Sequence, residues 1–213
     1  SRVEESLALL GLSPEDIDIV LMTHMHHDHS GGLTYVNEQG ELVSKYPNAK
    51  IIVNDVEWYE MRNPNNRTRG TYLRENWEPI QEQVTVYSEY INVIPEIQMI
   101  RTSGHSNGHS IILLKQNEDT MIHMGDLMLT HVHRNPLWVP AVDDYPMKSI
   151  LAKDKWLRQA FENHYKFFFY HDQFLAVAEF DKEGKEFVDY VLRSRPPVIP
   201  FTDQQDRRPD FLG

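Results

Sequence analysis

The stretch "LMTHMHHDHSGG", residues 21–32, decides the fold because it concentrates four histidines and one aspartate directly after an apolar segment. His24 and His26 are two residues apart, so both imidazoles point to the same side of an extended segment. Asp28 and His29 follow after the chain turns, and the two closing glycines allow the backbone to bend tightly. The motif therefore offers a histidine pair to one metal ion and an Asp–His pair to a second.

Imidazole and carboxylate ligands suit Zn²⁺, with Mn²⁺, Fe²⁺ and Co²⁺ as alternatives. The competing interpretation is a histidine-rich surface loop that binds metal only by accident. The acidic residue within the H-x-H-x-D-H pattern favours a built site over such a loop. His27 occupies the intervening position of the pattern and is predicted not to bind metal.

The composition limits the classes of protein to which the chain can belong. Its 213 residues, 40% hydrophobic and 25% charged, suit one globular domain, and no apolar run reaches the roughly 18 residues of a membrane-spanning helix. The net charge of −11 disfavours nucleic-acid partners, whose binding depends on clustered Lys and Arg. The absence of cysteine excludes disulfides and thiolate metal sites, and it fits a cytoplasmic location.

The chain opens with Ser1 rather than Met, and residues 2–10 have the apolar spacing of a helix without a preceding start signal. We therefore interpret the sequence as a fragment or a trimmed chain, from which a signal peptide could have been removed. Residues 1–194 are predicted to form the domain. The Pro-, Asp- and Arg-rich residues 195–213 are predicted to form a loosely ordered tail.

Apolar, β-branched runs and helical spacing alternate along the chain, which predicts an α/β fold. Strands are expected at 17–22, 48–55, on both sides of the polar loop in 97–115, at the start of 120–128, and in 166–172. Helices are expected at 2–10, 55–61, 146–164 and 185–194, with a short helix at 78–83 after a polar loop over 62–77.

Polar clusters follow four of the predicted strands, at 24–29, 105, 126 and 171. Taken singly, His105 could be an ordinary loop histidine, Asp126 a helix N-cap, and His171 the end of a strand. Because loops at one edge of a sheet converge, these residues can instead meet at one site. Together they provide five histidines and two aspartates, enough for two metal ions that share a bridging carboxylate.

The motifs "THMHHDH", "TSGHSNGH", "GD" and "YHD" resemble, in order and approximate spacing, the metal motifs of the metallo-β-lactamase superfamily, over the chain up to about residue 194. The resemblance implies an αβ/βα sandwich with a dinuclear site at one edge of its sheets. It assigns His24, His26 and His105 to one ion, Asp28, His29 and His171 to the other, and Asp126 to both.

Members of this family carry a first group of strands, ending in an Asp-Thr-Gly-like stretch, before the helix with which this chain opens. The resemblance therefore implies that the N-terminal strands are missing. A sheet edge left uncovered in this way is prone to aggregation. A chain with only these residues is expected to be poorly soluble, completed by a partner, or inactive.

Two metal ions about 3.5–4 Å apart can share a hydroxide for attack on an electrophile, and Asp28 could accept or relay a proton. Lactones, thioesters, β-lactams and phosphoesters are all within reach of this chemistry. The stretches "LMLTHVHRNPLWVPAVDDYP", "NDVEWYEMRNPNN" and "RENWEPI" resemble the quorum-quenching lactonase (YtnP-like) branch of bacilli. That resemblance implies a lactone of the acyl-homoserine type as the small-molecule substrate, and a homodimer as a further expectation.

One position departs from well-known acyl-homoserine lactonases, which have a tyrosine three residues after the bridging aspartate. Leu129 stands there, and His131, His133 and Tyr145 are the candidate catalytic substitutes. Structural hydrogen bonds within the loop are the alternative role for the two histidines, and core packing is the role expected for Trp138. The aromatic residues around the 62–77 loop could line a pocket rim or pack against helices: Trp58, Tyr59, Tyr72 and Trp77.

Other functions remain as alternatives at this point. A phosphotriester hydrolase would use the same metal chemistry, and a truncated member of the family could be inactive. A redox di-iron protein would use similar ligands, although the related flavodi-iron branch adds a flavodoxin domain that is not seen in these residues. A nucleic-acid processing enzyme is disfavoured by the acidic balance of the chain.

Overall fold

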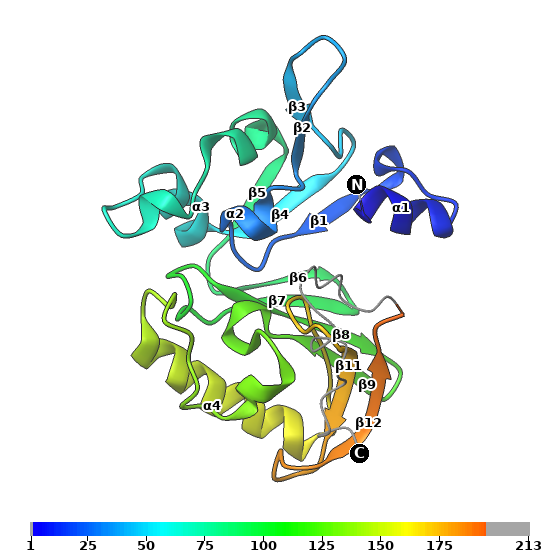
Figure 1. Ribbon diagram of the computed structural model, residues 1–213, viewed down its shortest axis with the longest axis vertical. Coiled ribbons are helices and arrows are strands. Elements are labelled where there is room, and N and C mark those ends of the chain that lie inside the picture. Colours follow the sequence, from blue (N-terminus) through cyan, green and yellow to red (C-terminus); the bar gives the residue numbers. More distant parts are fainter. Residues whose placement is uncertain (1, 195–213) are drawn as a thin grey trace, which may run out of the picture.

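The computed structural model describes residues 2–194 and contains two main β-sheets with helices on their outer sides, together with a separate two-stranded hairpin (Figure 1). The predicted tail over 195–213 lies outside the described residues. Helix α1 (Arg2–Leu9) opens the chain, close to its predicted bounds. Within the described residues, no helix is long and apolar enough to span a membrane.

The smaller sheet is parallel and carries the first metal motif at the end of its first strand. Its order is β1-β4-β5, with β1 (Ile19–Leu21), β4 (Lys50–Asn54) and β5 (Val84–Tyr87). Helix α3 (Asp55–Arg62) follows β4 directly, and the Asn54 side chain caps it by accepting a hydrogen bond from the Val56 amide at 3.0 Å. A short hairpin precedes β4, formed by β2 (Thr34–Val36) and β3 (Leu42–Ser44).

The larger sheet has the order β12-β11-β10-β9-β8-β7-β6. Its strands are β6 (Tyr90–Ile94), β7 (Ile97–Arg101), β8 (Ser110–Gln116), β9 (Asp119–His123), β10 (Lys166–Phe168), β11 (Leu175–Phe180) and β12 (Phe187–Leu192). Neighbours are antiparallel except β9 and β10, which are parallel. The crossover between these two contains helix α4 (Pro146–Glu162), as a parallel pair requires.

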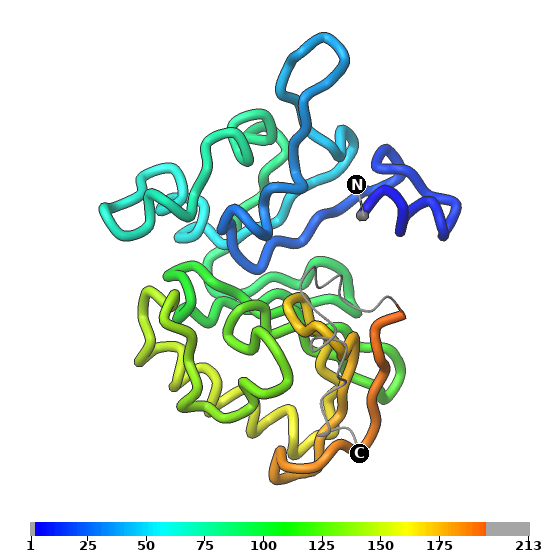
Figure 2. The backbone as a smooth tube through the Cα atoms, viewed as in Figure 1, coloured from blue at the N-terminus to red at the C-terminus, as the bar shows by residue number. Residues whose placement is uncertain are grey.

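Alternation along β4 shows how the layers are joined. Ile51 and Val53 pack with the α3 residue Met61 in one core, whereas Ile52 faces the opposite side and packs with Met99 of the larger sheet. A third core fills the space between the larger sheet and α4. The chain trace places the small sheet at one end of the molecule and α4 at the other (Figure 2). The order helix–sheet–sheet–helix confirms the predicted αβ/βα sandwich.

The predicted helix over 185–194 is wrong, because these residues form the edge strand β12. Phe187 packs against the α4 core, whereas Val188, Tyr190 and Val191 are exposed, so no helical apolar face is buried. β-Branched and aromatic residues fit a pleated strand better than a helix. Pairing with β11, at Tyr190 with Ala178 for example, supplies the hydrogen bonds that decide the outcome.

Candidate metal centre

The structure brings the seven predicted metal ligands into two adjoining groups. His24 and His26 follow β1, while Asp28 and His29 lie in the one-turn helix α2 (His27–Ser30). The other three lie after β7, β9 and β10. Within each group the donor atoms lie within 4.8 Å of one another: His24, His26 and His105 form one group, and Asp28, His29, Asp126 and His171 form the other. His27 belongs to neither group.

The three-histidine group is buried and faces one oxygen of Asp126. His26 Nδ1 lies 2.9 Å from His105 Nε2, which lies 3.4 Å from Asp126 Oδ2. His24 Nε2 lies 3.9 Å from the same oxygen and has no hydrogen-bond partner within the described chain. Burial lowers the pKa of His24 well below its ordinary value and that of His26 to about 3. Both rings are therefore neutral at pH 7 and can present lone pairs to a cation.

The second group faces the other oxygen of Asp126. His29 Nε2 and His171 Nε2 are 3.1 Å apart, and they lie 3.1 Å and 3.3 Å from Asp126 Oδ1. Each also lies 3.5 Å from Asp28 Oδ2. Burial alone would raise the pKa of Asp126, but hydrogen bonds from His171 and His29 hold it far below its ordinary range. One ionised carboxylate thus adjoins both groups.

The spacing of these atoms fits divalent cations. Tetrahedral coordination with Zn–N and Zn–O bonds of about 2.0–2.1 Å places the donor atoms about 3.3–3.4 Å apart. The neighbouring donors within the two groups, at 2.9–3.5 Å, bracket that spacing. The unpartnered His24 Nε2 is the kind of buried polar atom that a bound ion would satisfy. The nitrogen and oxygen donor set suits Zn²⁺ and its close substitutes.

Asp143 contacts the His105 ring on the side away from the three-histidine group, and it is not among the residues predicted from the sequence. Its Oδ1 lies 2.8 Å from His105 Nδ1, so the opposite nitrogen of that ring faces the group. Burial lowers the pKa of His105, but the hydrogen bond to Asp143 and the nearby carboxylates of Asp126, Asp143 and Glu57 together raise it above its ordinary value. Asp143 lies in the acidic "VDDY" stretch, but its pairing with a histidine 38 residues away depends on the tertiary fold.

His109 positions the shared carboxylate through the backbone. The Asp126 amide donates to His109 Nε2 at 3.2 Å, and His109 Nδ1 lies 2.9 Å from the Thr102 hydroxyl. Gly125 has φ +51°, and a Cβ there would lie 2.6 Å from His109 Nε2. The glycine of the "GD" motif is therefore required for both its backbone conformation and its close approach to the histidine.

Tyr170 adjoins the second group and was also missed. Its ring lies 4.5 Å from the His29 ring and 4.8 Å from the His171 ring, measured between centroids. Its hydroxyl donates to the Asp28 carbonyl oxygen at 2.9 Å. The tyrosine of the "YHD" motif therefore ties the α2 turn to the loop after β10.

The three residues predicted to assist catalysis lie around the groups but in neither of them. His131 is buried, and both its amide and its Nδ1 bond the Asp172 carboxylate, at 2.9 Å and 2.5 Å. His133 Nδ1 lies 2.9 Å from the Thr130 hydroxyl. The Tyr145 amide donates to the carbonyl oxygen of Gly104, the residue before His105, at 2.9 Å.

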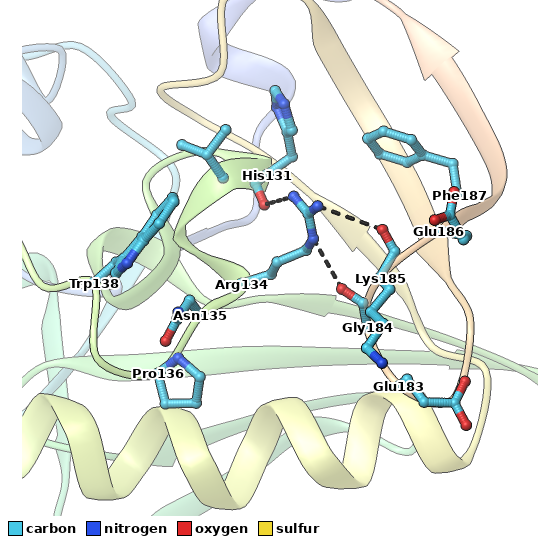
Figure 3. A pocket seen from close by; sticks show the side chains of 11 residues that line it. His131, Arg134, Asn135, Pro136, Trp138, Glu183, Gly184, Lys185, Glu186 and Phe187 are labelled. Carbon is cyan, nitrogen blue, oxygen red and sulfur yellow. Dashed lines mark hydrogen bonds between the residues drawn. The ribbon is translucent and has the colours of Figure 1, made fainter. Parts of the chain in front are cut away.

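A cavity of about 790 Å³ lies between the His131–Arg134 turn and the connection from β11 to β12 (Figure 3). Arg134 holds its two sides together by donating to the Gly184 carbonyl oxygen at 2.8 Å. Trp138 lines this cavity and is 56% exposed, so the prediction that it packs in the core is wrong. It sits on the loop between the His131–Arg134 turn and α4, outside the helix whose apolar face fills the core.

The aromatic residues around the 62–77 loop have separate environments. Trp58 and Tyr72 are buried in the α3 core, and Trp77 packs against that core. These three therefore pack against helices, the second of the two roles considered for them. Tyr59 points the other way and is exposed.

Comparison with known proteins places this centre in a family. Residues 1–160 match the model of the metallo-beta-lactamase superfamily. An N-acyl homoserine lactonase of Bacillus cereus is 28% identical over 121 residues, covering 57% of this chain and 42% of its own. The N-acyl homoserine lactonase AttM of Rhizobium radiobacter is 26% identical over 117 residues, covering 52% and 41%. The chain thus spans less than half the length of these relatives.

Solved structures agree on the fold. A probable metal-dependent hydrolase from Staphylococcus aureus superposes with a TM-score of 0.87 at 38% identity, covering 92% of this chain and 69% of its own. AidC, a dizinc quorum-quenching lactonase in complex with a product, gives a TM-score of 0.74 at 19% identity, covering 91% and 70%. The family model and the Staphylococcus aureus hydrolase together show that the chain belongs to the metallo-β-lactamase superfamily.

Proposed function

We propose that this chain forms the metal centre of a dinuclear hydrolase that opens lactones of the acyl-homoserine type, with Zn²⁺ as its expected ions. The observation that carries the proposal is the Asp126 carboxylate, whose two oxygens face two separate ligand groups. The superfamily and the ligand groups support dependence on divalent metal. The names of the curated relatives support a lactone as the substrate.

Two divalent ions held by these groups would lower the pKa of a shared water and polarise the carbonyl oxygen of the substrate. Asp28 is suited to accept or relay a proton, because its side chain is 45% exposed whereas the Asp126 side chain is almost fully buried. Tyr170 holds the backbone of Asp28 by donating a hydrogen bond to its carbonyl oxygen. This bond does not involve the Asp28 carboxylate.

Among the three candidates, Tyr145 is the residue that we propose as the donor of a hydrogen bond to the substrate. Both His131 and His133 have a ring nitrogen committed to a neighbouring side chain. Tyr145 is only partly buried and lies next to Asp144, whose amide donates to the His105 carbonyl oxygen. Burial raises the pKa of the Tyr145 hydroxyl, so it carries its proton at neutral pH.

The substrate class is tested by measuring hydrolysis of N-hexanoyl-homoserine lactone and of paraoxon by the full-length protein loaded with zinc. The proposal expects ring opening that is lost with a chelator and restored by Zn²⁺. Tyr145→Phe is expected to lower kcat for the lactone by about 10²-fold, the usual effect of removing one donor to a developing oxyanion. Turnover of the phosphotriester without lactone opening would replace the proposed reaction with phosphoester hydrolysis.

A further inference from the structure

Glu57 is a fully buried carboxylate that belongs to neither ligand group. It lies in the first turn of α3, and its side chain has 0% exposure. Among the described ion pairs, none joins it to a lysine or an arginine. Burying a carboxylate without a cation is costly unless hydrogen bonds and nearby positive charge compensate it. The position of Glu57 therefore needs a reason.

Its hydrogen bonds reach both loops that carry the three-histidine group. Oε1 accepts from the Met25 amide at 2.8 Å, and Met25 stands between His24 and His26. Oε2 accepts from the Ser106 hydroxyl at 2.5 Å, and Ser106 follows His105. One side chain thus joins backbone segments about 80 residues apart in sequence, directly beside all three ligands.

Two further contacts fix the carboxylate in place. The Tyr72 hydroxyl donates to Oε1 at 3.0 Å, and the Tyr72 ring lies 5.1 Å from the His26 ring. A Cβ at Gly108 would overlap the backbone nitrogen and Cα of Glu57, so the loop after His105 rests directly on the first turn of α3. The distance between α3 and this loop is therefore set by close packing as well as by hydrogen bonds.

Charge gives the carboxylate a second role. Histidine side chains bind metal as neutral ligands, and among the described residues the proposed ligand carboxylate that adjoins the three-histidine group, Asp126, is shared with the second group. A divalent ion there would keep most of its positive charge uncompensated by its own ligands. Burial outweighs the hydrogen bonds from Ser106, Met25 and Tyr72 and raises the pKa of Glu57, whereas a divalent ion held by the adjoining histidines would favour its ionised form. An anion beside the group would favour a bound cation.

We propose that Glu57 is a positioning residue for the three-histidine group. It fixes the loop of His24 and His26 relative to the loop of His105, and its negative charge favours a divalent cation in that group. The inference rests on the metal centre proposed above. Partners of this kind behind metal ligands typically contribute 10–100-fold to metal affinity.

The test is a titration of the metal-free full-length protein with Co²⁺, followed by its visible absorption spectrum and by competition with a chelator. Glu57→Gln keeps the shape of the side chain and removes its charge. It is expected to weaken Co²⁺ binding at one of two sites by about 10–100-fold and to alter the spectrum of that site. Thermal unfolding of the metal-free variant is compared with that of the wild type as the fold control.

Glu60→Gln is the matched control, because Glu60 lies one turn further along α3 and accepts a hydrogen bond from the Asn107 side chain at 2.7 Å. It should leave Co²⁺ binding unchanged. Should Glu57→Gln fail to fold, Ser106→Ala and Tyr72→Phe each remove one donor to the carboxylate and are expected to weaken binding at the same site.

The outcomes separate the two proposals. If the wild type binds two Co²⁺ ions and the Glu57, Ser106 and Tyr72 variants bind them with wild-type affinity and spectrum, the role of Glu57 is overturned and the metal centre stands. If Glu60→Gln weakens Co²⁺ binding as much as Glu57→Gln does, the role of Glu57 is also overturned. The weakening would then follow from any change of a carboxylate between α3 and the loop after His105. If the wild type binds no Co²⁺ at these groups, the metal centre itself is rejected.

Discussion

At the scale of single residues, the proposed metal centre is surrounded by buried acidic side chains. The described part of the chain buries Glu57, Asp126, Asp143 and Asp172. Hydrogen bonds from histidines, hydroxyls and backbone amides reach these carboxylates, and no described ion pair joins them to Lys or Arg. Two divalent ions would bring four positive charges into this region, which offsets the cost of burying the carboxylates.

Asp126→Asn tests the shared carboxylate. The amide keeps the shape of the side chain but removes the negative charge that faces both groups. We expect the zinc retained after dialysis, measured by elemental analysis, to fall from two ions per chain to one or fewer, because both groups lose an anionic ligand. Asp119→Asn, an exposed aspartate in β9, is the control and should retain the wild-type zinc content. Two tightly held ions in the Asp126 variant would contradict the bridging assignment.

Asp143→Asn tests the support of His105. The variant loses the carboxylate bonded to Nδ1 of the ring, so the ring's orientation and basicity both change. We expect zinc affinity, measured by chelator competition, to fall by about 10–100-fold. Asp144→Asn removes an aspartate that pairs with Arg67 instead and should bind zinc as the wild type does. Equal affinities in the two variants would show that Asp143 does not support the ligand.

At the scale of elements, the segment from Thr130 to Asp144 connects the two ends of the centre. Near its start, His131 bonds Asp172, the neighbour of the proposed ligand His171; near its end, Asp143 bonds the proposed ligand His105. Its middle is held on α4 by the buried Lys153, whose Nζ donates to the carbonyl oxygens of Asn135 and Trp138. The position of this segment is thus coupled to ligands of both groups.

Lys153 makes that anchor pH-dependent. Burial lowers its pKa from 10.5 to about 8, so the folded chain releases this proton at a lower pH than the unfolded chain. The charge of Lys153 therefore opposes folding below pH 8, and this penalty is relieved as the pH rises from about 8 to 10.5. The neutral amine still has two N–H groups for its two carbonyl acceptors.

We expect the free energy of unfolding of the wild type, relative to Lys153→Met, to increase between pH 8 and pH 10. Urea unfolding of both proteins at each pH measures this difference, in which the titration of all other groups largely cancels. Lys155→Met, on the same helix but exposed, should show a constant difference from the wild type. A constant difference for Lys153→Met as well would contradict the lowered pKa.

The elements also show what local sequence can and cannot predict. The strand β4 is predictable because both of its faces are buried, which gives a short continuous apolar run, and α4 is predictable because its apolar residues recur with the helical period on one buried side. The segment of β12 was misread because most of its apolar side chains face solvent, so pairing with β11 decides its structure. The spatial grouping of the proposed ligands could be predicted from the order of their motifs. Glu57 and Asp143 could not be predicted, because their partners are 32 and 38 residues away in sequence.

At the scale of the whole molecule, the two groups of proposed metal ligands lie where loops from the two sheets meet. The first motif follows β1 of the small sheet, and the other ligands follow β7, β9 and β10 of the large sheet. Bound ions would therefore link the two sheets as well as supply chemistry. The core of Ile52, Tyr87, Met99 and Ile112 joins the same two sheets.

Removal of metal should accordingly lower the melting temperature. Ligand present at 100 times its dissociation constant stabilises a fold by about 2.7 kcal/mol, and for a chain of this size each kcal/mol corresponds to roughly 2–4 °C. We expect treatment with a chelator to lower the melting temperature by about 5–10 °C and added Zn²⁺ to restore it. Mg²⁺ at the same concentration is the control, since it prefers octahedral oxygen ligands. Identical melting with and without Zn²⁺ would mean that the ions do not link the sheets.

The central claim, that two metal ions are held around one shared carboxylate, is tested most directly by anomalous diffraction at the zinc edge from crystals grown with Zn²⁺. We expect two peaks, one at about 2.0–2.2 Å from His24, His26 and His105 and one at that distance from Asp28, His29 and His171, with Asp126 bound to both. A single peak, or peaks away from these side chains, would contradict the dinuclear centre.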